Sequence, residues 1–386
     1  MKRKTISVLL SITLTGVLLM GCGSGSTSVG SAAASETAAT SGTTEKSVAA
    51  SAEASSSAAA DSKNLPILGA GIYSSTDNFN SYIAKAIQNS SKGVFQVNVD
   101  DGQMDQSTQL NQIDTSLAKG AKAICVSVVD ITAAPTIIQK CQDAGNVPLI
   151  FFNKEITDKN VVKSYDKLYQ VTSTGGDYGA AIEGQMIVDY WKAHPEMDKN
   201  KDGKMQMIDI MGDPGHTASK PRADYLKSTI EKAGIKIDLL EEDTGMWDTT
   251  KAKEKMDAWI SKYGNDIECI GCANDAMALG ALQSIEAAGY NTEGSKSSKY
   301  IPVIGIDALP EMLEKIKSGE VIGSVLQDAK TQGKLIVGIA NNLCQNKDPL
   351  NGMDLKLDTD GSKAVRVPYK AITSDNVNEA ASTYAN

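Results

Sequence analysis

From Leu65 onward, short apolar runs alternate with segments whose apolar residues recur every three or four positions. Such recurrence is typical of helices, as in the set Phe79, Tyr82, Ile83, Ala86 and Ile87 and in the set Leu110, Ile113 and Leu117. The strand-like runs include PILGAGIY, VFQVNV, AICVSVV, VPLIFF, MQMIDIM, IECIGCA, IPVIGI and VIGSVL. Strands and helices in alternation predict an α/β fold in which helices flank both faces of parallel sheets.

Polar residues directly follow five of these apolar runs. They are Asp130, Asn153, the pair Asn274 and Asp275, Asp307, and the pair Gln327 and Asp328. Ligands of open parallel sheets bind beyond the carboxyl ends of the strands. Carboxylates and amides can exchange hydrogen bonds with neighbouring hydroxyl groups, so the pattern favours a polyhydroxylated ligand. Each single residue can equally be a turn former or a helix cap.

The N-terminus reads as an export signal. Lys2, Arg3 and Lys4 precede an apolar stretch, which ends in LMGC at Cys22. This ending resembles the bacterial lipobox, which implies a signal over residues 1–22, cleavage ahead of Cys22 and a lipid on its sulfur. An ordinary signal peptide or a membrane anchor is the alternative, but the run is short for a spanning helix. Residues 23–64 are rich in Ser, Ala and Thr and predict a disordered tether.

Charge and cysteine content narrow the class of protein further. The net charge is −9, and it becomes −12 without the three basic residues of the signal. This acidic balance argues against a nucleic-acid partner. The run CIGC, Cys269 to Cys272, has the spacing of a redox pair but lies inside an apolar strand. We therefore predict two buried thiols there.

The stretch DKNKDGKMQ resembles most of a calcium-binding loop. Asp198, Asn200 and Asp202 stand at loop positions one, three and five, and Gln206 stands at position nine. Gly203 occupies position six, where the sharp turn lies. An EF-hand needs a glutamate at position twelve and a following helix, whereas this chain continues as a strand. The last ligand must therefore come from elsewhere in the chain.

Longer motifs give a family resemblance over essentially everything from Leu65 to the end of the chain. They are STDNF, FFNKE, DKNKDGKMQ, GDPGH, MWDTTKAKEKMDAW, NDAMALG and IPVIGIDALPEML. In these motifs the chain resembles the bacterial galactose/glucose-binding proteins, which are type I periplasmic sugar-binding proteins. The resemblance implies two similar α/β lobes joined by three hinge segments near Thr172, Gln332 and Val367. The implied N-terminal lobe is 65–172 plus 332–366, and the C-terminal lobe is 173–331 plus 367–386.

The resemblance also implies a set of site residues. Asp77, Asn153, His216, Arg222, Asn274 and Asp307 would bond sugar hydroxyls, and Phe79 and Trp247 would stack on the two faces of the sugar ring. Gln327 stands where the family has an asparagine. Glu268 would complete a structural Ca²⁺ site with Asp198, Asn200, Asp202, Gln206 and the backbone carbonyl of Lys204.

A second departure from the family pattern is Ala218, which stands where the family has an acidic residue near the anomeric hydroxyl. A nearby residue or a water molecule can replace such a contact. A sharper hypothesis is that Ala218 opens this end of the site, so that a glycoside fits as well as the free sugar.

These expectations together indicate a lipid-anchored, non-enzymatic sugar-binding component of an ABC importer outside the cell membrane. Its implied partners are a hexose, the permease and its ATPase, and a chemoreceptor contact is known in the family. We expect a monomer. A carbohydrate-active enzyme would also use carboxylates and a histidine in a cleft, but the chain lacks a nucleophile elbow and a catalytic zinc motif. The signal and the lack of a helix-turn-helix segment argue against a regulator, whereas a pentose or furanone ligand stays open.

Overall fold

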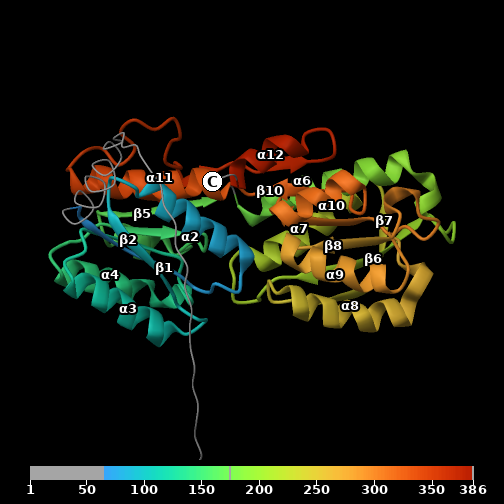
Figure 1. Ribbon diagram of the computed structural model, residues 1–386, viewed down its shortest axis with the longest axis horizontal. Coiled ribbons are helices and arrows are strands. Elements are labelled where there is room, and N and C mark those ends of the chain that lie inside the picture. The colour runs from blue at the N-terminus through green and yellow to red at the C-terminus, as the bar shows by residue number, and fades with distance from the viewer. Residues whose placement is uncertain (1–64, 174, 385–386) are drawn as a thin grey trace, which may run out of the picture. The chain divides into compact units, whose positions relative to one another are not determined.

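The computed structural model describes residues 65–173 and 175–384 (Figure 1). The predicted signal over residues 1–22, the lipidation site Cys22 and the tether over residues 23–64 lie outside this described part.

The first lobe is built on a six-stranded sheet with the order β11-β5-β4-β3-β1-β2. All five pairings in it are parallel. Its strands are β1 Ile67–Ile72, β2 Gln96–Asp101, β3 Ala123–Val126, β4 Leu149–Phe152, β5 Leu168–Ser173 and β11 Ala364–Val367. Its helices are α2 Asn78–Ser90, α3 Gln106–Ala118, α4 Ala134–Asp143, α5 Lys159–Lys163 and α11 Ala329–Cys344.

The second lobe repeats this plan with a sheet of order β12-β10-β9-β8-β6-β7. Here β12 runs antiparallel to β10 at the edge, and the other pairings are parallel. The strands are β6 Lys204–Met211, β7 Lys236–Thr244, β8 Cys269–Cys272, β9 Val303–Asp307, β10 Gly323–Leu326 and β12 Lys370–Ile372. The helices are α6 Gly176–Ala193, α7 Ser219–Lys232, α8 Thr249–Tyr263, α9 Asp275–Ala287, α10 Pro310–Ser318 and α12 Val377–Tyr384. Short 3₁₀ turns occupy Ile131–Ala133, Pro195–Met197, Gly264–Asp266 and Gly294–Lys296.

Each sheet has an apolar core on both faces, as expected for the α/β fold. In the first lobe, Ile83 of α2 and Ile336 of α11 belong to one core cluster. Ile113 of α3 and Ile137 of α4 belong to the other. The central strands β3 and β4 are buried at every position, which explains why they read as unbroken apolar runs. Gly333 lets α11 approach α2 closely, because a Cβ there would lie 2.5 Å from the Cβ of Ala86.

The chain passes between the two sheets three times. It leaves the first sheet after β5 and enters the second lobe with α6. It returns between β10 and α11, because α11 packs its buried face into the core of the first lobe. The last passage lies between β11 in the first sheet and β12 in the second. The two-lobed fold with three connecting segments is therefore as the sequence predicted.

All eight strand-like runs contain a strand, and both apolar helix patterns lie in helices, α2 and α3. Four further strands are not among those runs. β7 is an edge strand with the sequence KIDLLEEDT, and none of its residues is fully buried. β11 and β12 are only 4 and 3 residues long, too short to give a periodic signal.

Candidate functional site

All nine predicted sugar-binding residues line one cavity between the lobes. They are Asp77, Phe79, Asn153, His216, Arg222, Trp247, Asn274, Asp307 and Gln327. The residues come from segments at the carboxyl ends of strands in both sheets, where ligands of parallel sheets bind. The structure therefore brings together, from positions up to 250 residues apart, the set that the sequence predicted.

Asp77 and Asn274 serve as helix caps as well as cavity walls. One Asp77 carboxylate oxygen accepts a hydrogen bond from the Asn80 N–H at 3.1 Å, at the start of α2. The other accepts a short hydrogen bond from the Tyr73 hydroxyl. Asn274 Oδ1 accepts from the Met277 N–H at 2.9 Å, at the start of α9. The capping alternative is thus correct for Asn274, and Asp77 has a capping role that the sequence analysis did not assign. In both residues the cap fixes the orientation of a side chain that lines the cavity.

The other polar residues at strand ends divide between the cavity and structural roles. Asp130 caps a 3₁₀ turn, and Asp328 caps α11, and neither lines the nine-residue cavity. Asp275 is fully buried and accepts hydrogen bonds from the Leu309 N–H at 2.8 Å and the Ser324 hydroxyl at 2.7 Å. Asp130 and Asp328 are therefore helix caps, and Asp275 links α9 to the segments after β9 and in β10 through its hydrogen bonds.

Three cavity residues hold unusual backbone conformations. Asn153 has φ 62°, Trp247 has φ 62° and Asp307 has φ 132°. Non-glycine residues rarely adopt positive φ, and such strain clusters at functional sites. Trp247 also packs directly on Gly212, where a Cβ would lie 2.0 Å from its ring. The GDPGH motif therefore contributes a glycine that the tryptophan requires, a role that the sequence analysis did not assign.

Arg222 is the central hydrogen-bonding group of the cavity. One guanidinium nitrogen donates to the Ala273 carbonyl at 2.5 Å, and the other donates to Gln327 Oε1 at 2.7 Å and to the Tyr369 hydroxyl at 3.1 Å. The guanidinium carbon lies 5.6 Å from the centre of the Trp247 ring. Among the described residues, no hydrogen-bond partner accepts from Arg222 Nε or from Trp247 Nε1. Both are buried donors of the kind that a ligand oxygen would satisfy.

His216 is buried between aromatic rings and cations. Its ring lies edge-on to Trp247 at 5.2 Å and to Tyr73 at 6.1 Å between centres. Nδ1 accepts from the Ala218 N–H at 3.1 Å, so the ring proton of the neutral form lies on Nε2. Burial lowers the pKa of His216 well below its ordinary value, and the charges of Lys154 and Arg222 act in the same direction. The histidine is therefore a neutral donor at physiological pH.

Burial also acts on the cavity carboxylates. It raises the pKa of Asp77, although hydrogen bonds from Tyr73 and Asn80 oppose this shift. It raises the pKa of Asp307 more strongly, against the attraction of Arg222. Lys154 and Tyr73 are neighbours that the sequence analysis missed. The Lys154 ammonium lies 4.2 Å from the centre of the Tyr73 ring and donates to the Val129 carbonyl at 2.8 Å.

Backbone N–H groups of the predicted calcium loop donate hydrogen bonds to the Glu268 carboxylate. One Glu268 oxygen accepts from the Lys199 N–H at 2.6 Å, and the other accepts from the Gln206 N–H at 3.1 Å. Asp198 accepts from the N–H groups of Asp202 and Gly203 at 3.1 and 3.0 Å. The structure thus brings Glu268 to the loop, although 62 residues separate it from Gln206.

The oxygens of this loop suit a hard cation such as Ca²⁺. Gln206 Oε1 is buried and has no partner among the described residues, which leaves one acceptor for a cation. Asn200 Oδ1 and Asp202 Oδ1 accept from the backbone of the loop itself at 2.9 and 2.8 Å. The Lys204 ammonium is half exposed and lies 3.8 Å from Asp238 and 4.0 Å from Asp202. Within residues 65–173 and 175–384, no three His, Cys, Asp or Glu side chains are arranged to hold a metal.

The two CIGC cysteines are buried thiols, as predicted. Cys269 and Cys272 lie in the fully buried strand β8 and are not joined by a disulfide. Burial raises the pKa of both thiols, which keeps them protonated.

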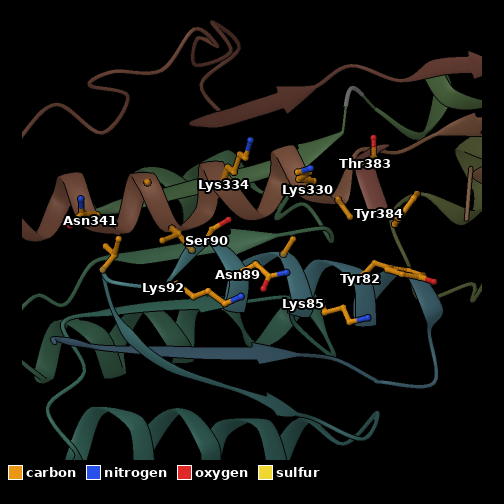
Figure 2. Close-up of a pocket in the computed structure, with 15 residues that line it drawn as sticks. Tyr82, Lys85, Asn89, Ser90, Lys92, Lys330, Lys334, Asn341, Thr383 and Tyr384 are labelled. Carbon is orange, nitrogen blue, oxygen red and sulfur yellow. The ribbon is translucent and has the colours of Figure 1, made fainter. Parts of the chain in front are cut away.

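A larger pocket lies between α2, α11 and the end of α12, apart from the nine-residue cavity (Figure 2). It has a volume of about 490 Å³ and includes Lys85, Lys92, Lys330 and Lys334. None of the nine cavity residues lines it. By contrast, the nine-residue cavity leaves about 20 Å³, which is room for about one water molecule.

The fold and the site define a class of protein: two α/β lobes with a polar and aromatic site between them, the architecture of a two-lobed binding protein. Residues 69–348 match the model of the periplasmic binding protein domain, and the chain belongs to this family.

Two relatives and one solved structure illustrate the similarity. The chain is 40% identical over 324 residues to the D-galactose/methyl-galactoside binding periplasmic protein MglB of Haemophilus influenzae, covering 83% of this chain and 92% of that protein. A putative rhizopine-binding protein of Rhizobium meliloti is 27% identical over 315 residues, covering 81% and 91%. A solute-binding protein of an ABC transporter from Bacillus halodurans, solved with myo-inositol, is 27% identical with a TM-score of 0.64, covering 83% of this chain and 98% of that one. In the described part of the chain, no helix is long and apolar enough to cross a membrane.

Proposed function

We propose that this protein is the extracytoplasmic substrate-binding lipoprotein of an ABC sugar importer. Its ligand would be a hexose, namely D-galactose, D-glucose or a methyl-galactoside-like glycoside. The observation that carries the proposal is the convergence of two aromatic and seven polar side chains on one buried cavity between the lobes. The similarity to the galactose-binding relative supports the choice of sugar.

The proposed site matches the two kinds of surface on a pyranose ring. The ring has apolar C–H faces and a rim of hydroxyl groups, so the aromatic rings of Phe79 and Trp247 would cover its faces. Carboxylates and amides would accept from the rim, and Arg222 Nε and His216 Nε2 would donate to it. Because caps and backbone conformation already fix several of these groups, little side-chain freedom would be lost on binding.

Binding would require the walls of the site to separate first. About 20 Å³ of space cannot admit a hexose. The three connecting segments supply the hinge for such a movement, and closing over the sugar would then exclude water from its hydrogen bonds. The closed form would dock on the permease, whose cytoplasmic ATPase drives transport.

The proposed Ca²⁺ would be held by Asp198, Asn200, Asp202, Gln206, Glu268 and the carbonyl of Lys204. It would neutralise the carboxylates and tie the start of β6 to the segment before β8. Because none of these residues lines the sugar cavity, we propose a structural ion.

The remaining parts of the proposal concern the membrane and the partners. A lipid on Cys22 would hold the protein at the outer face of the membrane, with residues 23–64 as a tether. The protein would act as a monomer, and contact with a chemoreceptor would use the closed form.

Calorimetric titration of residues 61–386 with D-galactose, D-glucose, their methyl glycosides, a pentose and myo-inositol tests the ligand. We expect a hexose or its methyl glycoside to bind tightly, with weaker binding of the pentose and of myo-inositol. If the pentose binds more tightly than the hexoses, the ligand is a pentose and the proposal of a hexose is wrong. No binding of any sugar would refute the proposed function.

A further inference from the structure

A second cavity adjoins the nine-residue cavity. It has a volume of about 350 Å³ and shares four lining residues with it: Asn153, His216, Arg222 and Gln327. We name this second cavity the side chamber and define it by the residues that only it contains, among them Glu155, Thr157, Ala218, Pro221, Tyr225 and Tyr369. Its size falls within the usual range of ligand pockets, about 300–1,000 Å³.

The chemistry of the side chamber suits a neutral, hydroxylated ring. Thr157 offers a hydroxyl group, and Tyr225, a residue that is 43% exposed, offers an aromatic ring. The Tyr369 hydroxyl already accepts from Arg222 and donates to Gln327 Oε1. Glu155 is already paired, because both of its oxygens accept from Arg366 at 2.6 and 2.8 Å. An ammonium group on a ligand would therefore find no free carboxylate on Glu155.

Ala218 stands beside the boundary between the two cavities. Its backbone N–H donates to Nδ1 of His216, which lines both cavities, and its own side chain lines the side chamber. A methyl group projects little from the start of α7. A longer side chain at this position would enter the side chamber next to the shared residues.

We propose that the side chamber binds the second ring of a neutral glycoside whose hexose lies in the nine-residue cavity. The ligand class is then a disaccharide or another glycoside with a ring-sized aglycone. This inference rests on the proposed function, because it needs a hexose in the first cavity.

The test compares ligands that share the same hexose and differ only in the aglycone, the part that the side chamber would bind. Residues 61–386 are titrated with D-galactose, both methyl galactosides, lactose, melibiose and the two nitrophenyl galactosides, and with the matching glucosides. We expect at least one ligand with a second ring to bind tenfold or more tightly than the methyl glycoside of the same anomer.

Two variants locate the second ring. Tyr225→Ala removes an aromatic contact and should weaken the ring-bearing ligand about 2- to 12-fold, with free hexose unchanged. Ala218→Leu fills the boundary and should remove the preference for the ring-bearing ligand. Leu239→Ala is the matched control, because Leu239 is 40% exposed on β7 and lies in neither cavity.

The outcomes separate this inference from the proposed function. If hexoses bind but every ring-bearing glycoside binds no better than its methyl glycoside, the side-chamber inference is wrong and the proposed function stands. The side-chamber inference is equally wrong if a ring-bearing ligand is preferred but neither variant alters that preference. If no hexose or glycoside binds at all, the proposed function itself fails.

Discussion

The sugar cavity and the proposed calcium loop both contain carboxylate and amide oxygens, but the structure orients these oxygens in different ways. In the cavity, the side chains come from both lobes, and contacts outside the ligand space orient them, as the caps at Asp77 and Asn274 do. In the loop, the oxygens accept from N–H groups of the same short segment, and only Glu268 comes from another part of the chain. The cavity therefore depends on how the lobes meet, whereas the loop depends on one lobe alone.

This difference predicts that damage to the two regions will appear in different measurements. A change in the cavity should act on affinity more than on stability. A change in the loop should lower stability and leave affinity nearly intact. Substitutions in each region, removal of the metal and a change of pH can test that separation.

The largest effect should come from Arg222→Lys. A lysine cannot contact Ala273, Gln327 and Tyr369 at once, so the buried network would lose part of its hydrogen bonding. We expect hexose binding to weaken by about 2–5 kcal/mol, which is roughly 30-fold or more, in calorimetric titration. The matched control is Arg366→Lys, which changes the other described arginine and should leave hexose affinity unchanged. Equal losses in both variants would contradict the assignment.

Removal of the proposed Ca²⁺ should have the largest effect on stability. A ligand present at a hundred times its dissociation constant stabilises a fold by about 2.7 kcal/mol. A chelator should therefore lower the free energy of unfolding by about this amount, which is measured as a lower thermal unfolding midpoint. Hexose affinity of the folded protein should change less than threefold. Glu268→Gln should abolish the response to the chelator. A chelator effect that persists in this variant would exclude Glu268 as a ligand.

Lowering the pH should remove the contribution that the buried, neutral His216 makes to stability. The pKa of His216 is lowered in the folded protein, so below pH 6.5 the unfolded chain binds a proton that the folded chain does not. The contribution of His216 to stability is therefore present above pH 6.5 and is lost as pH falls, by at most about 1.4 kcal/mol per pH unit. Asp275, whose burial raises its pKa to about 7, opposes this trend because it takes up a proton on folding between pH 4 and 7. The difference in stability between wild type and His216→Gln, followed by denaturant titration from pH 7.5 to 5.5, isolates the histidine and should shrink toward low pH.

The smallest effect should come from Gln327→Asn. The shorter side chain would withdraw Oε1 from the Arg222 guanidinium and from the Tyr369 hydroxyl. Loss of one such bond costs about 0.5–1.5 kcal/mol, so hexose affinity should fall by roughly 2- to 12-fold. Gln345→Asn at the C-cap of α11 is the control, because Gln345 does not line the cavity. A gain in affinity would mean that the longer glutamine restricts the site.

The fold was predictable because its central strands are buried on both faces and therefore read as apolar runs. β7 was not, because an edge strand carries charged residues and its pairing depends on the neighbouring strand β6. In the cavity, residues within long motifs, such as Asn153 in FFNKE and Trp247 in MWDTTKAKEKMDAW, were predictable as a set. Tyr73 and Tyr369 were not, since their proximity to the cavity comes from packing of segments that are distant in the sequence. Lys154 lies in FFNKE, but its packing over the Tyr73 ring could not be predicted from the motif.

The return of α11 to the first lobe has a consequence for how the chain acquires its structure. The core of this lobe includes Leu335, Ile336 and Ile339 of α11, and its sheet is completed by Val365 and Val367 of β11. A nascent chain that ends near Ser173 lacks these residues, so the apolar face of β1, β3 and β4 is covered by α2 but not by α11. The first lobe therefore cannot mature as an independent N-terminal unit during synthesis. The first lobe should complete its core only after residue 367 is available, and its dependence on contacts between distant segments favours slow folding.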